Sequence, residues 1–114
     1  MAADIIATVR VSNSLDLSVH PDPIPCGKRP DHDMDIQWHI ETKGWKFMPN
    51  GIVFKDNDDG TFHDPQPGDS DFHWTNDNHN KRLYHYTVNV ISTDGKTTLT
   101  YDPAIENRGD QLGS

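Results

Sequence analysis

The segment Asn80–Ser92 reads NKRLYHYTVNVIS and contains the most regular alternation in the chain. At a period of two, one side of this segment carries Tyr84, Tyr86, Val88 and Val90. Polar residues lie between them. Alternation over this length, in residues that favour an extended backbone, predicts a long strand with one buried face. We therefore expect this segment to be the central strand of a β-sandwich.

Shorter segments with the same period precede and follow it. Apolar residues alternate with polar ones over residues 5–11, 15–20, 34–40, 45–47, 72–74 and 97–101, and residues 52–54 are apolar throughout. Between these segments, the prolines at 21, 23 and 25 predict an extended edge or crossover, because proline donates no ladder hydrogen bond. Pro49-Asn50-Gly51 predicts a turn between two short strands, and residues 56–71 are expected to be mainly loop.

The fold class follows from these patterns. No segment shows a sustained 3.6-residue apolar period, which argues against helices. Seven to eight short strands separated by turn residues are typical of an antiparallel β-sandwich. We expect an all-β, immunoglobulin-like arrangement in a single domain over residues 1–114, with a small β-barrel as the alternative.

Charge and cysteine content restrict the classes of partner. The formal net charge of −8 disfavours both a nucleic acid and an anionic membrane surface as a partner. A single cysteine, Cys26, excludes an intrachain disulfide and a thiolate zinc site. The first eleven residues have neither a basic region nor a long apolar run, so they predict no signal peptide and no membrane anchor. We expect a cytoplasmic protein.

A set of short motifs resembles a known family. The set comprises Asp35-Ile36-Gln37-Trp38, Gly44-Trp45-Lys46-Phe47, Gly51-Ile52, Phe72-His73-Trp74, Tyr84-His85-Tyr86-Thr87-Val88 and Asp102-Pro103-Ala104-Ile105-Glu106-Asn107. Together these motifs resemble the DP-EP family of small bacterial proteins, over most of the chain. The resemblance implies a compact all-β bacterial protein of poorly defined role, and it implies no catalytic residues.

Histidines are the first candidate ligands, because seven in 114 residues is a high count. His39, His73 and His85 are expected to point away from the apolar faces of their strands. If the strands of His39 and His85 are neighbours, their imidazoles and a carboxylate from Glu41 or Asp35 would suit Zn, Ni or Cu. The alternative is that these histidines are ordinary polar surface residues.

Two aspartate-rich segments are candidates for calcium. Asp31, Asp33 and Asp35 have the first three ligand spacings of an EF-hand loop, but that loop's glycine and final glutamate are missing. Residues 56–59 supply oxygen ligands for a noncanonical calcium loop. A solvated turn between two strands is the alternative there.

Tryptophans are the remaining candidates for ligand binding. Trp45 and Trp74 lie on short strands near loops, where a flat ring could stack on a sugar, although packing in the core is the alternative. No nucleophile elbow, phosphate-binding glycine loop or dinucleotide fingerprint is present. The sequence therefore predicts a non-enzymatic protein that acts by self-association or by binding a protein or a glycan. The alternative is a divalent-metal protein.

Overall fold

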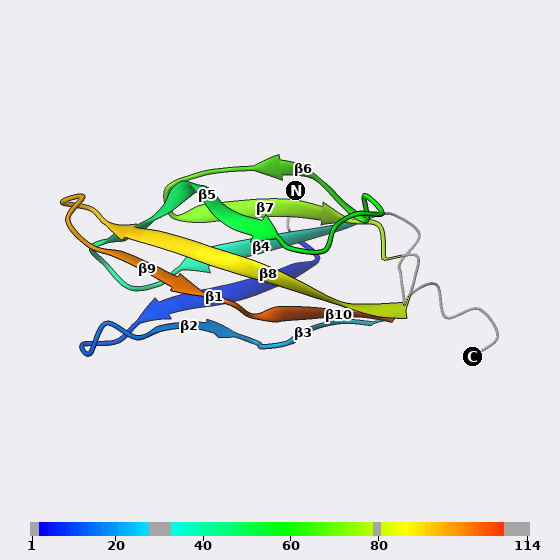
Figure 1. The fold of residues 1–114 in the computed structure, drawn as a ribbon, viewed down its shortest axis with the longest axis horizontal. Helices are drawn as coiled ribbons and strands as arrows, with labels where there is room; N and C mark the ends of the chain where they lie inside the picture. Colours follow the sequence, from blue (N-terminus) through cyan, green and yellow to red (C-terminus); the bar gives the residue numbers. More distant parts are fainter. Residues whose placement is uncertain (1–2, 28–32, 79–80, 109–114) are drawn as a thin grey trace.

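The computed structural model describes residues 3–27, 33–78 and 81–108, which form ten strands (Figure 1). The strands are β1 (Ile5–Val11), β2 (Leu17–His20), β3 (Ile24–Cys26), β4 (Met34–Ile40), β5 (Trp45–Phe54), β6 (Phe62–Gln66), β7 (Asp71–Asn76), β8 (Lys81–Ser92), β9 (Thr98–Tyr101) and β10 (Ala104–Arg108). No helix able to cross a membrane occurs in these three ranges.

The strands form two sheets. Sheet I has the order β2-β1-β4-β7-β6, and sheet II has the order β3-β10-β8-β5, with β9 also paired to β8. The all-β prediction is confirmed. The purely antiparallel prediction is wrong, because β1 pairs with β4 in parallel and β10 pairs with β3 in parallel. Parallel neighbours need a long connection, and the chain between β1 and β4 supplies one that includes β2 and β3.

β8 is the central strand of sheet II, as its alternation predicts. One of its edges pairs with β5, and the other pairs with β10 and then with β9. The four side chains on its apolar side, Tyr84, Tyr86, Val88 and Val90, are fully buried. In Figure 1, β8 runs along most of the length of the molecule.

Side chains from both sheets form one hydrophobic core. Trp38 of β4 lies edge-on to Tyr86 of β8, with ring centroids 5.4 Å apart. The Trp38 indole Nε1 donates a hydrogen bond of 3.1 Å to the Tyr86 hydroxyl. Phe54 of β5 stacks on Phe62 of β6 at 3.8 Å between centroids. Aromatic side chains therefore join the two sheets at several points.

The structure corrects four local expectations. Leu15 is not in a strand: its φ is 63° and its side chain is exposed in the turn before β2. The expected turn around Pro49 lies within one continuous strand, β5, whose pairing register shifts between Phe47 and Ile52 as in a β-bulge. The expected loop contains β6, and residues 104–108, for which no strand was expected, form β10. With β3 as a further strand and β5 as one strand in place of two, the described residues hold ten strands instead of seven or eight.

The proline-rich run ends in an edge strand, as expected. β3 contains Pro25 and pairs with β10, so it forms one edge of sheet II. A proline is tolerated there because an edge strand needs ladder hydrogen bonds on one side only.

Candidate metal centre

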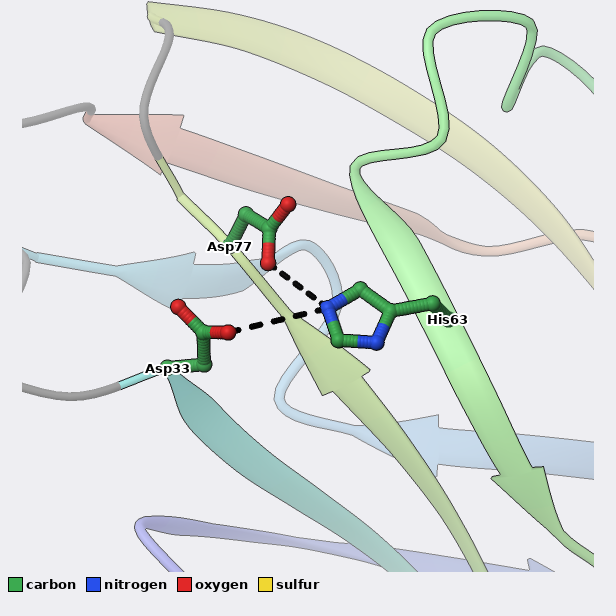
Figure 2. A group of neighbouring side chains, drawn as sticks. All are labelled: Asp33, His63 and Asp77. Atoms are coloured by element: carbon green, nitrogen blue, oxygen red, sulfur yellow. Dashed lines mark hydrogen bonds and ion pairs between the residues drawn. The ribbon is translucent and has the colours of Figure 1, made fainter.

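Three strand ends of sheet I meet at one end of the molecule. β4 and β6 both run antiparallel to β7, and the first residue of each lies opposite Asn76, the last residue of β7. Asp33 immediately precedes β4, Asp77 immediately follows β7, and His63 is the second residue of β6. The pairing of the sheet therefore brings these three side chains together (Figure 2).

One ring nitrogen of His63 faces both carboxylates, as Figure 2 shows. His63 Nε2 lies 2.7 Å from Asp77 Oδ1 and 3.7 Å from Asp33 Oδ2. One potential ligand atom from each residue lies within 4.8 Å of the other two. The side chains of His63, Asp33 and Asp77 are 36%, 40% and 30% exposed, so an ion from solvent can reach them.

The second ring nitrogen of His63 also faces a carboxylate. His63 Nδ1 lies 3.1 Å from Asp64 Oδ2. Asp64 has a φ of 54°, and the register of β6 against β7 shifts between His63 and Gln66. This irregularity lies directly beside the candidate ligand, in the kind of place where β-bulges redirect side chains.

The backbone that carries His63 is held firmly. The neighbouring Phe62 is buried and is clamped by Asn57, whose Oδ1 accepts from the Phe62 N–H at 2.9 Å. Asn57 Nδ2 in turn donates to the Phe62 carbonyl at 2.7 Å. The Asp77 N–H donates to the Thr61 carbonyl at 2.9 Å, which joins the end of β7 to the chain before β6.

Asn78 forms hydrogen bonds with the chain next to the two aspartates. It is fully buried, and its backbone N–H donates to Asn76 Oδ1 at 2.9 Å. Its Nδ2 donates to the Gly27 carbonyl at 2.8 Å and contacts Met34 Sδ at 3.4 Å. Asn76 and Met34 adjoin Asp77 and Asp33 in sequence, so these contacts of Asn78 anchor the chain next to both aspartates.

The electrostatics of the cluster favour a cation. The hydrogen bond to Asp77 and the weaker effect of Asp64 raise the pKa of His63, although desolvation acts in the opposite direction. Protonated His63 carries one positive charge, against three on the carboxylates of Asp33, Asp64 and Asp77. These four groups therefore keep a net negative charge even when the imidazole is protonated.

The geometry and the donor set fit a divalent transition metal. Two ligands of a tetrahedral ion, each about 2.1 Å from it, are about 3.4 Å apart. The His63 Nε2 to Asp33 separation of 3.7 Å is already close to this value. The contact between Nε2 and Asp77, at 2.7 Å, would lengthen by about 0.7 Å as a metal replaces the shared proton. One imidazole and two carboxylates suit Zn²⁺, Fe²⁺ or Mn²⁺.

The histidines that the sequence singled out lie elsewhere. His39 is on β4 in sheet I, where its Nδ1 lies 2.8 Å from Asp71 Oδ1. His85 is on β8 in sheet II, where its Nδ1 lies 3.4 Å from Asp56 Oδ2. The condition for a shared His39–His85 site, that β4 and β8 be neighbours in a sheet, is not met.

His73 has a carboxylate partner of its own. Its Nδ1 lies 3.1 Å from both carboxylate oxygens of Asp35, one of the two acidic residues expected near a histidine. The other, Glu41, forms an ion pair with Arg10 at 3.2 Å. Metal binding by His39, His73 or His85 remains a prediction.

The candidate calcium loop is occupied by a side chain of the protein itself. Arg82 Nη1 lies 3.1 Å from Asp59 Oδ2, and its Nη2 lies 3.3 Å from Asp58 Oδ1 and 3.1 Å from the Asp56 carbonyl. A guanidinium therefore occupies the position expected for the cation. In the other calcium candidate, Asp31 lies outside the described residues.

Both candidate tryptophans pack against the core and are partly buried. Trp74 Nε1 donates to the Ile52 carbonyl at 3.0 Å, and its ring lies edge-on to Phe54. A surface groove of about 460 Å³ beside the start of β5 is lined mainly by apolar residues. Neither Trp45 nor Trp74 lines this groove. Carbohydrate binding by these two residues remains a prediction.

Sequence reasoning missed His63 because Thr61-Phe62-His63 interrupts an aspartate-rich stretch that was expected to be loop. A single apolar residue, Phe62, followed by three polar residues and a proline is a weak strand signal, and it says nothing about which strand lies beside it. No protein-family model and no curated protein matches this chain.

Proposed function

We propose that this chain is a small, non-enzymatic β-sandwich protein that binds a divalent transition metal through Asp33, His63 and Asp77. The observation that carries the proposal is the convergence of one imidazole nitrogen and two carboxylates within 4.8 Å. These donors come from three different strand ends, which the sheet pairing brings together. Ligands on rigid elements need little rearrangement to bind an ion.

The competing account is a purely structural ion pair, in which a protonated His63 bridges the two aspartates. Among the four groups Asp33, His63, Asp64 and Asp77, one imidazolium leaves negative charge that a divalent ion would neutralise, which is consistent with metal binding. The partial exposure of the three side chains is consistent with metal binding, because a hydrated ion can reach them. A proton and a metal then compete for the same nitrogen, His63 Nε2.

Several broader features belong to the same proposal. We infer an immunoglobulin-like sandwich, which two five-stranded sheets and one shared core support. The DP-EP resemblance supports a bacterial origin, and the acidic composition supports a cytoplasmic protein without nucleic-acid or membrane partners. Self-association or a protein or glycan partner is a further proposal.

Isothermal titration tests the metal site. The untagged full chain, freed of metal by chelation, is titrated separately with Zn²⁺, Mn²⁺, Ni²⁺, Cu²⁺ and Ca²⁺. We expect one transition-metal ion per chain and at least a tenfold loss of affinity in His63→Ala, because one of three protein ligands is removed. Asp33→Asn and Asp77→Asn should weaken binding in the same direction.

His39→Ala and His85→Ala are matched controls, because each removes an outward-facing histidine that also contacts one aspartate. Both should bind metal as the wild type does. Binding that survives in His63→Ala but is lost in His39→Ala would reject the proposed site. A wild-type protein that binds none of the five ions would reject the function itself.

A further inference from the structure

We propose that Asp64 is a positioning residue of the metal centre, whose carboxylate holds the Nδ1 side of His63 so that Nε2 faces Asp33 and Asp77. The inference rests on the proposed function and specifies how its imidazole ligand is oriented. Asp64 itself does not contact the ion.

The two ring nitrogens of His63 face different carboxylates. His63 Nδ1 lies 3.1 Å from Asp64 Oδ2, while Nε2 faces the other two carboxylates. A neutral imidazole has one N–H and one lone pair, so a ring that binds metal through Nε2 must keep its proton on Nδ1. A carboxylate that accepts this proton fixes the tautomer and makes the ligating nitrogen more basic.

The backbone of Asp64 has an uncommon conformation. Its φ of 54° lies in the left-handed region, which favours glycine and which aspartate adopts more often than most other residues. Asp64 also precedes Pro65, a position that normally favours an extended backbone. Strained conformations of this kind persist where the surroundings hold them, and they concentrate at functional sites.

The side chain of Asp64 contributes little to the core, because it is 75% exposed. Its partner in an ion pair is the candidate ligand His63. The low burial of Asp64 and its contact with His63 therefore fit a role at the candidate ligand better than a role in the core.

Two substitutions at this position separate positioning from folding. Asp64→Gly removes the carboxylate and accommodates the left-handed backbone, so the metal-free protein should melt at the same temperature as the wild type or higher. Its dissociation constant for Zn²⁺ should nevertheless rise about tenfold or more, at unchanged stoichiometry. Asp64→Asn keeps an acceptor oxygen without the charge and should give an intermediate loss of affinity.

The tautomer provides a readout that a structural role would not change. In ¹⁵N-detected spectra of the zinc-loaded wild type, His63 should carry its proton on Nδ1, whereas zinc-loaded Asp64→Gly should lose this fixed signature. Asp102→Asn is the control for loss of one exposed carboxylate, because Asp102 contacts Thr87 on sheet II and Lys55, which follows β5. It should leave Zn²⁺ affinity unchanged.

The outcomes distinguish the two proposals. If Asp64→Gly binds Zn²⁺ with wild-type affinity and the same tautomer, the positioning role is wrong and the metal site stands. If Asp102→Asn weakens binding as much as Asp64→Asn does, net charge explains the effect and the positioning role is again wrong. If the wild type binds no Zn²⁺, the proposed function fails and the positioning role fails with it.

Discussion

Asn76 and Asn107 exchange two amide hydrogen bonds in the interior of the molecule. Asn76 Nδ2 donates to Asn107 Oδ1 at 2.8 Å, and Asn107 Nδ2 donates to Asn76 Oδ1 at 3.1 Å. Asn76 belongs to β7 of sheet I and Asn107 to β10 of sheet II, so the pair joins the two sheets. Because both side chains are almost fully buried, sliding one sheet along the other would leave amide groups without partners.

The Asn76–Asn107 pair predicts that removing one of its two amide groups lowers the free energy of unfolding substantially. Asn107→Ala leaves part of the buried Asn76 amide without its partner, and we expect the free energy of unfolding to fall by about 2 kcal/mol. Urea denaturation followed by tryptophan fluorescence measures the change. Asn13→Ala, in the exposed turn after β1, is the control and should change stability by less than about 0.5 kcal/mol. An equal effect of the two substitutions would show that the buried pair does not stabilise the fold.

The sequence was sufficient to predict the class of fold and most buried faces. Alternation identifies the buried side chains of a strand without knowledge of its neighbours, so Tyr86 and Trp38 were both expected in the core. Short strands such as β6 were missed because their signals are weak. The bulge in β5 was missed for a different reason: Pro49-Asn50-Gly51 predicts a turn between two strands, whereas it lies inside one ten-residue strand.

The candidate site could not be predicted in the same way, because it depends on which strands are neighbours. Asp33, His63 and Asp77 meet only because β4 and β6 flank β7. Which strands pair across a large distance in sequence is decided by the tertiary structure. Period-two alternation within one strand carries no information about its neighbours. For the same reason, the expectation for His39 and His85 depended on their strands being neighbours, and these strands lie in different sheets.

Cys26 should be chemically inert in the folded protein. Burial raises the pKa of its thiol to about 12, and the hydrogen bond from Asn76 only partly opposes this effect. Since the thiolate is the reactive form, we expect Cys26 to react with a disulfide reagent at neutral pH only as fast as the protein opens. Prompt reaction of the native protein would contradict the buried position, and reaction in denaturant provides the control.

The same thiol predicts a loss of stability in alkali. Its pKa is higher in the folded than in the unfolded chain, so above pH 9 the unfolded state loses a proton that the folded state retains. The Cys26 contribution is therefore complete below pH 9 and decreases as pH rises toward 12, by up to about 1.4 kcal/mol per pH unit. Urea denaturation between pH 9 and 10, below the usual tyrosine pKa, should show this slope in the wild type. The slope should be smaller in Cys26→Ala.

His63 should titrate above its usual range in the metal-free protein. Asp77 raises its pKa chiefly through the hydrogen bond, so protonation of His63 stabilises the fold fully below pH 6.5. That contribution is lost as pH rises through the folded-state pKa. An NMR titration of the imidazole protons should show a pKa above 6.5, and a lower one in Asp77→Asn. A pKa below 6.5 in the wild type would contradict the observed contacts.

Arg82 should exclude calcium from the turn that contains Asp58 and Asp59. Its guanidinium contacts both carboxylates and lies 4.6 Å from the centroid of the Tyr84 ring. Calcium would have to displace this internal cation, so 10 mM Ca²⁺ should not change the melting temperature of the wild type. Arg82→Gln removes the positive charge beside the carboxylates of Asp58 and Asp59 and the Asp56 carbonyl, so we expect this variant to bind Ca²⁺ weakly, with a Kd of about 1 mM. This variant should melt below the wild type without calcium and regain stability with it, whereas Mg²⁺, which prefers smaller and more rigid sites, should restore less.

Calcium stabilisation of the wild type would show that Arg82 does not block the turn. A variant that does not respond to calcium would show that the turn lacks the geometry of a site.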